Sequence, residues 1–345
     1  MARSRSYEAP RRKRSASRVF AGIFGVVVVL AIVLTGVWFY LARELDRRVA
    51  AALDEAAGGG TTITCTDREV FGYPFRLGLS CSALGVEAPA NGVRVTAGAL
   101  HTAAQVYDPS RIVAELASPA SVEAPGLPPL ALRWDLAQTS TGLWSDGLER
   151  VSLVMDNPVV ALQAAGGAAG AEIARSTRLE AHARRNGSSL DVALTDAGIV
   201  AAVPGIPVMP PFDVSADMTV DGAAGWLRSG VPGGRFGPAL RGQAGVVRQL
   251  RLSLPSGGGA EVSGPFRVSQ DGRISGDFRL ALENPQAIAG LVGVLVPGTG
   301  GIATSIAGAV GFVGRQENGQ TVVDVQVRDG EARLGFIPLG DLPRL

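Results

Sequence analysis

The two cysteines are the residues whose spacing most directly predicts chemistry. Cys65 and Cys81 lie at equal distances from Tyr73 in the segment TTITCTDREVFGYPFRLGLSC. In a hairpin that turns at Gly72-Tyr73-Pro74, the two side chains would face each other across neighbouring strands, where Cα atoms are about 4.5 Å apart and a disulfide can form. The alternatives are two buried free thiols and a two-thiol metal site, although no histidine lies nearby to complete a metal site.

The other candidates for catalysis or metal binding form no recognisable motif. His101 and His182 are the only histidines, and both lie in alternating segments that are typical of ordinary strand residues. No serine stands in a G-x-S-x-G elbow, and the sequence alone cannot show two carboxylates facing each other. We therefore predict no catalytic residue, no cofactor and no metal site. A hydrolase that uses carboxylates or a serine is the enzymatic alternative.

An uncharged segment near the N-terminus predicts a helix that crosses a membrane. Residues 19–42, VFAGIFGVVVVLAIVLTGVWFYLA, carry no charge. About 24 helical residues extend about 36 Å, which exceeds a hydrocarbon core of about 30 Å. The aromatic residues Trp38, Phe39 and Tyr40 close the segment, where their rings favour the headgroup region. A cleaved signal peptide is the alternative, but its apolar region would have about 7 to 15 residues.

The charge distribution predicts which side of the membrane each part occupies. Residues 1–18 hold seven basic residues and Glu8, a net charge of +6, so the net charge of +1 leaves −5 for the rest. Basic residues next to a membrane helix stay in the cytoplasm, which places the bulk of the chain on the outer side. This basic run directly abuts the apolar segment, as a topology signal does, so we predict contact with the lipid bilayer through residues 19–42 and no nucleic-acid partner.

The rest of the chain predicts a mainly β (α+β) fold. Residues 43–60 indicate a juxtamembrane helix and a glycine linker, and residues 61–345 one antiparallel domain, because Asn-Gly and Asp-Gly pairs favour hairpin turns. These pairs are Asn91-Gly92, Asp146-Gly147, Asn186-Gly187, Asp221-Gly222, Asp271-Gly272, Asn318-Gly319 and Asp329-Gly330. Around Asn186-Gly187, one face is predicted to carry Leu179, Ala181, Ala183, Leu190, Val192 and Leu194. Val-Glu-Ala-Pro occurs at residues 86–89 and 122–125, too short a match to establish a repeat.

A second uncharged stretch, between Glu283 and Arg315, predicts a pair of short helices. Asn284 and Pro285 are typical of a helix start, and Pro297 cannot lie inside a helix, so Gly298 to Gly301 are predicted to form the connecting turn. Each half has about 12 residues, too few to cross a bilayer, so the helices either pack on the sheet or form a hairpin that touches lipid or closes an apolar groove. The residues predicted for this packing or groove are Ile288, Leu291, Val294, Leu295, Ile302, Ile306 and Val310.

Two segments resemble a bacterial family catalogued as domain of unknown function 2125. They are the cysteine segment with Gly-Tyr-Pro-Phe-Arg-Leu at residues 72–77, and DGEARLGFIPLGDLPRL at residues 329–345. Gly-Tyr-Pro-Phe before a strand is also similar to AsmA-like envelope proteins, which are linked to outer-membrane assembly or lipid traffic. The resemblance implies an inner-membrane anchor with a periplasmic β domain, and it brings no catalytic residues.

These observations together favour a non-enzymatic role in biogenesis of the cell envelope. The β domain would bind a lipid, a lipidated partner or another envelope protein, on the strength of the anchor, the sheet and the uncharged stretch at residues 284–314. A structural scaffold for an envelope complex is the alternative beside a periplasmic hydrolase.

The predicted topology can be tested with fusions to alkaline phosphatase, which is active only after export. A fusion after residue 60 should be active and a fusion ending at Arg18 inactive, because the basic residues hold the N-terminus in the cytoplasm. The opposite pattern of activity would refute the orientation.

Overall fold

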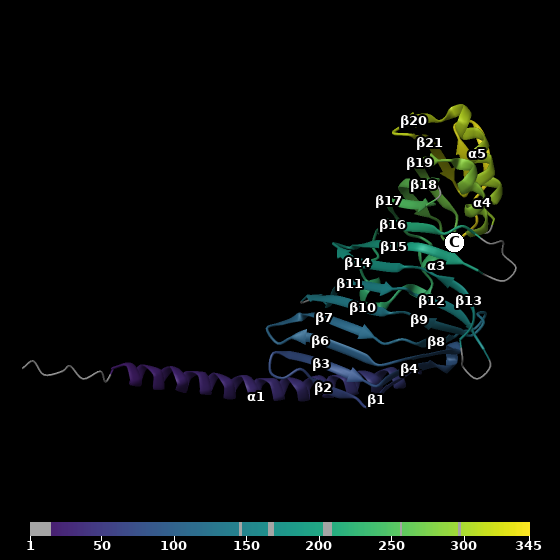
Figure 1. Cartoon of the computed structure of the whole chain (residues 1–345). Coiled ribbons are helices and arrows are strands. Elements are labelled where there is room, and N and C mark those ends of the chain that lie inside the picture. The colour runs from purple at the N-terminus through teal and green to yellow at the C-terminus, as the bar shows by residue number, and fades with distance from the viewer. Residues whose placement is uncertain (1–14, 145–146, 165–168, 203–208, 256, 296–297) are drawn as a thin grey trace, which may run out of the picture.

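The computed structural model describes residues 15–345, apart from 145–146, 165–168, 203–208, 256 and 296–297 (Figure 1). It confirms the predicted fold class, because a long N-terminal helix is followed by antiparallel strands and by two short apolar helices near the C-terminus. Residues 1–14 of the predicted basic tail lie outside this description.

Helix α1 (Ser15–Gly58) runs without interruption through the predicted membrane segment and the juxtamembrane segment. It contains no proline, and alanine and leucine are among the best helix formers. Among the described helices it is the one long and apolar enough to cross a membrane, and none of its apolar window is buried by the rest of the protein. After the helix, Gly60 has a φ of 81°. The chain then reverses, so that the first strands lie beside the helix (Figure 1).

The strands form two antiparallel series, which we call the short sheet and the long sheet. The short sheet has the order β1 (Thr62–Thr66), β4 (Ala83–Ala88), β5 (Val93–Ala97), β8 (Ala120–Glu123), β9 (Leu130–Arg133), β12 (Val159–Gln163) and β13 (Ala169–Arg175). The long sheet begins with β2 (Glu69–Phe71), β3 (Arg76–Cys81), β6 (Leu100–Gln105), β7 (Asp108–Leu116), β10 (Leu136–Trp144), β11 (Gly147–Asp156), β14 (Arg178–Asn186) and β15 (Ser189–Ala201).

The long sheet continues to the C-terminal part of the chain. Its later strands are β16 (Phe212–Val220), β17 (Ala244–Ser253), β18 (Gly259–Val268), β19 (Ile274–Glu283), β21 (Gln320–Arg328), β22 (Glu331–Leu334) and β23 (Ile337–Asp341), with β20 (Arg315–Glu317) paired to β21. The end of β15 also pairs with β13, and this pairing joins the two sheets.

Consecutive strands alternate in pairs between the two sheets. β2 and β3 belong to the long sheet, β4 and β5 to the short sheet, and the alternation continues to β14. Where the chain passes from one sheet to the other, as from β3 to β4 or from β5 to β6, only one to three residues separate the strands. Each such pair is therefore one bent strand that belongs to both sheets (Figure 1). Hydrogen bonds continue across the bends, from Gly98 N–H to the Pro119 oxygen (3.1 Å) and from Asn157 N–H to the Thr177 oxygen (3.0 Å). We call this line of bends the seam.

Special backbone positions produce several of the bends. Asp67, Asn157 and Gly198 have φ values of 49°, 50° and 65°, in the left-handed region that asparagine, aspartate and glycine tolerate best. At Gly98, a Cβ atom would lie 2.7 Å from the Ala117 oxygen, so only glycine allows the neighbouring strand to come this close. The seam therefore depends on a few residues that interrupt otherwise regular alternation.

The hydrophobic core is concentrated in the C-terminal half. Its three clusters of buried apolar side chains extend from Leu190 to Leu339 and lie between the long sheet, the helices and the chain end. In the described residues before Leu190, few apolar side chains of the β domain are buried, and they are Cys81, Ala88, Ala131, Trp134, Ala137 and Ala161. Hydrogen-bonded ladders and half-covered apolar faces, rather than a packed core, hold the N-terminal half together.

Most of the predicted hairpins are confirmed. Asn318-Gly319 and Asp329-Gly330 connect paired strands with positive φ at both residues, as a type I′ turn requires. Asn91-Gly92, Asn186-Gly187 and Asp271-Gly272 also connect paired strands. Around Asn186-Gly187 the register places Ala181 opposite Leu194 and Ala183 opposite Val192, on the predicted face.

Two of the predicted hairpins differ from the others. Asp221-Gly222 was wrongly predicted as a tight hairpin, because α2 (Trp226–Ser229), η3 (Pro232–Gly234) and α3 (Phe236–Ala239) lie between β16 and β17. Asp146 lies outside the described residues, although β10 and β11 on either side of it do pair.

A buried carboxylate ties the middle of the long sheet together. Asp191 is 5% exposed and accepts hydrogen bonds from Thr219 (2.7 Å) and Arg184 (3.0 Å). Burial raises the pKa of Asp191, but the hydrogen bonds from Thr219, Arg184 and Asn186 and the charge of Arg248 outweigh it and lower the pKa to about 2. The folded protein thus holds Asp191 ionised where the unfolded chain would begin to protonate it.

This carboxylate should make stability depend on pH in the acid range. Its pKa is lower in the folded chain than in the unfolded chain, so it stabilises the fold above about pH 4 by about 2 kcal/mol and loses this contribution as the pH falls towards 2. Asp191→Asn should therefore reduce the free energy of unfolding at pH 7 and leave it nearly unchanged at pH 2, as measured by urea denaturation. Asp277→Asn, at a 61% exposed side chain paired with Arg328, is the control and should change little at either pH.

Candidate functional site

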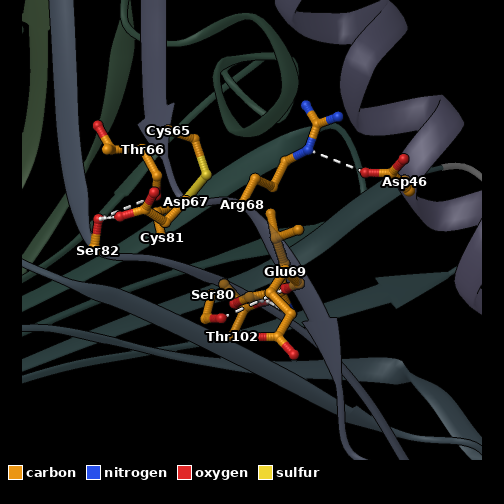
Figure 2. The surroundings of a disulfide bond; sticks show 11 residues. Asp46, Cys65, Thr66, Asp67, Arg68, Glu69, Ser80, Cys81, Ser82 and Thr102 are labelled. Carbon is orange, nitrogen blue, oxygen red and sulfur yellow. Dashed lines mark hydrogen bonds and ion pairs between the residues drawn. A yellow bond between two sulfur atoms is a disulfide. The ribbon is translucent and has the colours of Figure 1, made fainter.

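A disulfide lies at the first bend of the seam, beside helix α1. Cys65 on β1 is bonded to Cys81 on β3, with a Cα–Cα distance of 5.2 Å (Figure 2). Cys81 is almost completely buried, and Ser82 N–H donates to the Thr66 oxygen at 2.8 Å just beyond the bond. The Ser82 hydroxyl also donates to Asp67 at 2.7 Å. The disulfide therefore fixes the two sheets to each other where they begin.

The predicted geometry for this disulfide was wrong. We expected one symmetric hairpin centred on Tyr73, with the cysteines opposite each other. The β2–β3 register instead places Phe71 opposite Gly78, and β1 leaves this hairpin to pair with β4, where Cys65 faces Leu84. The bond thus joins the short sheet to the long sheet and does not cross a hairpin. Asp67, with its positive φ, lies between β1 and β2, where the chain passes from the short sheet to the long sheet.

Helix α1 is fixed to the β domain at the same place. Arg68 pairs with Asp46 on the helix at 3.0 Å (Figure 2). Trp38, which lies in the apolar segment, is 6% exposed and its indole N–H donates to the Arg76 oxygen at 2.7 Å. A buried indole with a satisfied N–H is a strong packing contact. The β domain therefore contacts the apolar segment itself, residues 19–42, which a cleaved signal peptide would include.

The two histidines lie apart in the described part of the chain. Residues suitable as metal ligands form no cluster among the described residues. His101 lies on β6 near Phe71, with ring centroids 6.2 Å apart, and His182 lies 3.6 Å from Glu180 on the exposed face of β14. Strands β7, β10 and β11 separate the two histidines in the long sheet.

One carboxyl near the seam has a raised pKa. Burial and the charge of Asp213 raise the pKa of Asp196, and a hydrogen bond with Ser176 acts against them. Asp213 itself accepts the Gly198 N–H at 2.7 Å, at a bend of the seam. In a serine hydrolase an imidazole takes the proton of the hydroxyl, and the two histidines lie beside Glu180 and Phe71. The hydrogen bond from Gly198 makes Asp213 a part of the backbone bend at the seam.

Two apolar helices cover the C-terminal end of the long sheet. Helix α4 (Pro285–Leu295) begins at the predicted proline, and helix α5 (Gly300–Val313) follows Gly298 and Thr299. Gly300 and Gly301, predicted in the connecting turn, form the start of α5. The helices pack against each other and against β18, β21 and β23 (Figure 1).

The structure brings most of the predicted apolar residues of these helices together. Ile288 and Leu291 are 2% and 5% exposed, and Ile302 and Val310 are 7% and 1% exposed. Val294 and Ile306 are partly buried against these clusters, and the side chain of Leu295 lies outside the described part. The helices therefore turn apolar side chains towards the sheet.

A cavity of about 390 Å³ lies between the two helices and the long sheet. Ile288, Val292, Ile302 and Ile306 line it on the helix side. The sheet side is formed by alternate residues of β17, β18, β19 and β21, which include Leu250, Val262, Leu280 and Val325. No charged side chain lines the cavity in the described part, and Thr299 is the one polar residue among its lining residues. The cavity can therefore accept an apolar group and excludes a charged one.

Sequence reasoning found the helix side of this cavity and missed the sheet side. Leu250, Leu280 and Leu282 lie in segments of alternating apolar residues, but alternation does not indicate that these strand faces meet the helices with space between them. The depth of a space depends on side-chain packing between distant segments, which alternation does not report.

Comparison with known proteins shows the family of the chain. Residues 38–343 match a family described as an uncharacterized protein conserved in bacteria, DUF2125, and the chain belongs to this family. The match begins at Trp38, which contacts the β domain. No curated protein and no solved structure matches the chain. The similarity to AsmA-like proteins thus stays a prediction.

The disulfide should contribute strongly to stability. Cys65→Ser should lower the free energy of unfolding by about 3 kcal/mol, because the loop between the cysteines is then no longer closed in the unfolded chain. Cys81→Ser should cost at least as much, since Cys81 is 2% exposed and the serine hydroxyl would be buried.

Urea denaturation with and without reductant measures this effect. Reductant should lower the stability of the wild type to that of Cys65→Ser and leave the variant unchanged. Two titratable thiols per chain in protein isolated under oxidising conditions would contradict the disulfide.

Proposed function

We propose that the chain is a non-enzymatic, single-pass membrane protein whose β domain binds the acyl chain of a lipid. Helix α1 supplies the anchor, and the cavity beneath α4 and α5 supplies the binding site. The observation that carries this proposal is the cavity itself, which has a volume of about 390 Å³ and apolar walls. Sites for small molecules have volumes of about 300 to 1,000 Å³.

The energetics favour an elongated apolar ligand. Protein interiors seldom contain empty spaces larger than a water molecule, and apolar spaces of this kind stay dry. Each methylene group that leaves water for such a space contributes about 0.8 kcal/mol. The polar head of a lipid has no partner inside, because side chains such as Ile288, Ile302 and Val325 line the walls. The head therefore remains outside while the chain enters.

The proposed location is the periplasmic face of the bacterial inner membrane. The seven basic residues before the apolar segment support a cytoplasmic N-terminus. The disulfide between Cys65 and Cys81 supports an oxidising compartment for the β domain. A role in envelope biogenesis, as in AsmA-like proteins, is part of this proposal. The hydrolase and the structural scaffold gain no specific support from the described residues.

A lipid with a photoreactive acyl chain tests the proposal. The full chain would be placed in bilayer nanodiscs that contain a phospholipid with a diazirine at the end of one acyl chain. After illumination, trypsin cleavage at Arg279 and Arg315 yields one peptide, residues 280–315, that contains both helices of the site. We expect lipid adducts on this peptide. Residues 19–43, another tryptic peptide, report the anchor.

Two substitutions in α5 separate binding in the cavity from contact on the outside of the helix. Ala303→Phe fills the cavity and should reduce adducts on residues 280–315 by about tenfold, which corresponds to about 1.4 kcal/mol. Ser305→Phe adds the same side chain at an exposed position of the same helix and should leave the adducts unchanged. Equal labelling of both variants, at unchanged melting temperature, would reject the cavity as the lipid site.

A further inference from the structure

One hairpin end of the long sheet, the β2–β3 turn, lies beside the apolar part of helix α1, and the β6–β7 turn adjoins it. The β2–β3 turn carries Tyr73, whose hydroxyl is 2.8 Å from the hydroxyl of Thr35 on the helix. One turn further along the helix, Trp38 donates its indole hydrogen bond to the Arg76 oxygen. The β2–β3 turn and the β6–β7 turn both point towards the N-terminal end of α1 (Figure 1). The β domain thus reaches back along the segment that is apolar enough to cross a membrane.

The second hairpin end is joined to the first. Val106 N–H, in the β6–β7 turn, donates to the Phe75 oxygen at 3.0 Å. The exposed fractions of Tyr73, Phe75 and Tyr107 are 53%, 62% and 77%. Two adjoining turns thus expose three large aromatic side chains, which we call the aromatic patch, and grouped exposed apolar side chains mark surfaces that bind a partner or a membrane. Phe39 and Tyr40 on the helix, 52% and 64% exposed, lie next in sequence to Trp38.

The length of the apolar segment decides where this patch lies relative to a bilayer. Arg18 and Arg43 bound the uncharged residues 19–42. About 20 helical residues cover a hydrocarbon core of about 30 Å, so a core that begins at Val19 ends near Trp38. A core that ends at Ala42 begins near Ile23. Thr35 lies within the core in both cases.

Tyr73 must therefore reach the membrane. The Thr35 hydroxyl donates to the Ala31 oxygen at 2.7 Å, so the Tyr73 hydroxyl donates to Thr35, and both hydroxyl protons are hydrogen-bonded in an apolar surrounding. Tyrosine and tryptophan favour the boundary between hydrocarbon and headgroups, where the ring is in lipid and the polar end is near water. Arg76 follows Phe75 directly and is exposed, and a guanidinium group binds phosphates such as those of lipid headgroups.

We propose that the β2–β3 and β6–β7 turns insert Tyr73, Phe75 and Tyr107 into the outer leaflet of the bilayer that α1 crosses. The patch is continuous with the anchor and acts as a second, shallow point of attachment. It sets the orientation of the long sheet relative to the membrane, which one helix alone leaves free to rotate. The inference rests on the membrane anchoring by α1 that is part of the proposed function.

Site-specific crosslinking to lipid tests this insertion. The photoreactive residue p-benzoyl-phenylalanine would replace Phe75, Tyr107, Leu30 or Phe336, one at a time, in the full chain in nanodiscs. Leu30, in the middle of the apolar segment, reports anchoring, and Phe336, 92% exposed between β22 and β23, is the control for an exposed aromatic position far from the helix. We expect lipid adducts at Phe75, Tyr107 and Leu30, and none at Phe336.

The outcomes separate this inference from the proposed anchoring. Adducts at Leu30 without adducts at Phe75 and Tyr107 overturn the insertion and leave the anchor in place. Absence of adducts at Leu30 overturns the anchor itself. Adducts at Phe336 equal to those at Phe75 overturn the insertion too, because the turns would then touch lipid no more than any exposed side chain.

Discussion

Each strand of the N-terminal half must hydrogen-bond to its neighbours on both sides while it bends from one sheet to the other. The requirement is strict, because an unpaired backbone group in a covered sheet costs as much as a lost hydrogen bond. The chain meets it with hydrogen bonds across the bends, such as Ser176 N–H to the Pro158 oxygen at 3.0 Å and Ala117 N–H to the Ala99 oxygen at 2.8 Å. Three features lie along this seam: the disulfide, Asp196 and strand β15, which joins the two sheets.

The two halves of the β domain are stabilised by different interactions. In the C-terminal half, Val220, Val268 and Val322 are completely buried, and two helices close the sheet. The N-terminal half has little buried apolar volume, so each bent strand depends on its immediate neighbours, as the units of a repeat protein do. A disulfide at the free end of such a structure prevents the first strands from fraying. The half with a packed core can tolerate a cavity, because many other contacts hold its walls.

The sequence predicts the hairpins well and the bends poorly. Asn318-Gly319 and Asp329-Gly330 are found because a type I′ turn needs positive φ, a property of these residues themselves. The bends also have local signals, such as Gly98 within an alternating segment and Asn157-Pro158 after another, but these signals resemble ordinary turns.

The two Val-Glu-Ala-Pro segments occupy related places in the structure. They lie at the ends of β4 and β8, which flank β5, and Arg94 on β5 pairs with Glu87 of one segment and Glu123 of the other. At the cavity, one wall was predictable from an uncharged stretch, whereas the space requires knowledge of distant packing.

The contacts of helix α1 with the residues on either side of β2 have a mechanical consequence. Asp46 meets Arg68 and Thr35 meets Tyr73, so 11 residues of the helix and 5 extended residues that include β2 both cover about 16.5 Å and run side by side. Further strands of the long sheet are then added sideways, at about 4.8 Å each. From β3 through β6, β7, β10, β11, β14, β15, β16 and β17 to β18, the nine steps reach about 43 Å. A rotation of the long sheet by about 5° relative to helix α1 would therefore displace the cavity at the far end of the sheet by about 4 Å. The stiffness of a few contacts around Asp46 and Cys65 sets how accurately the far end is positioned.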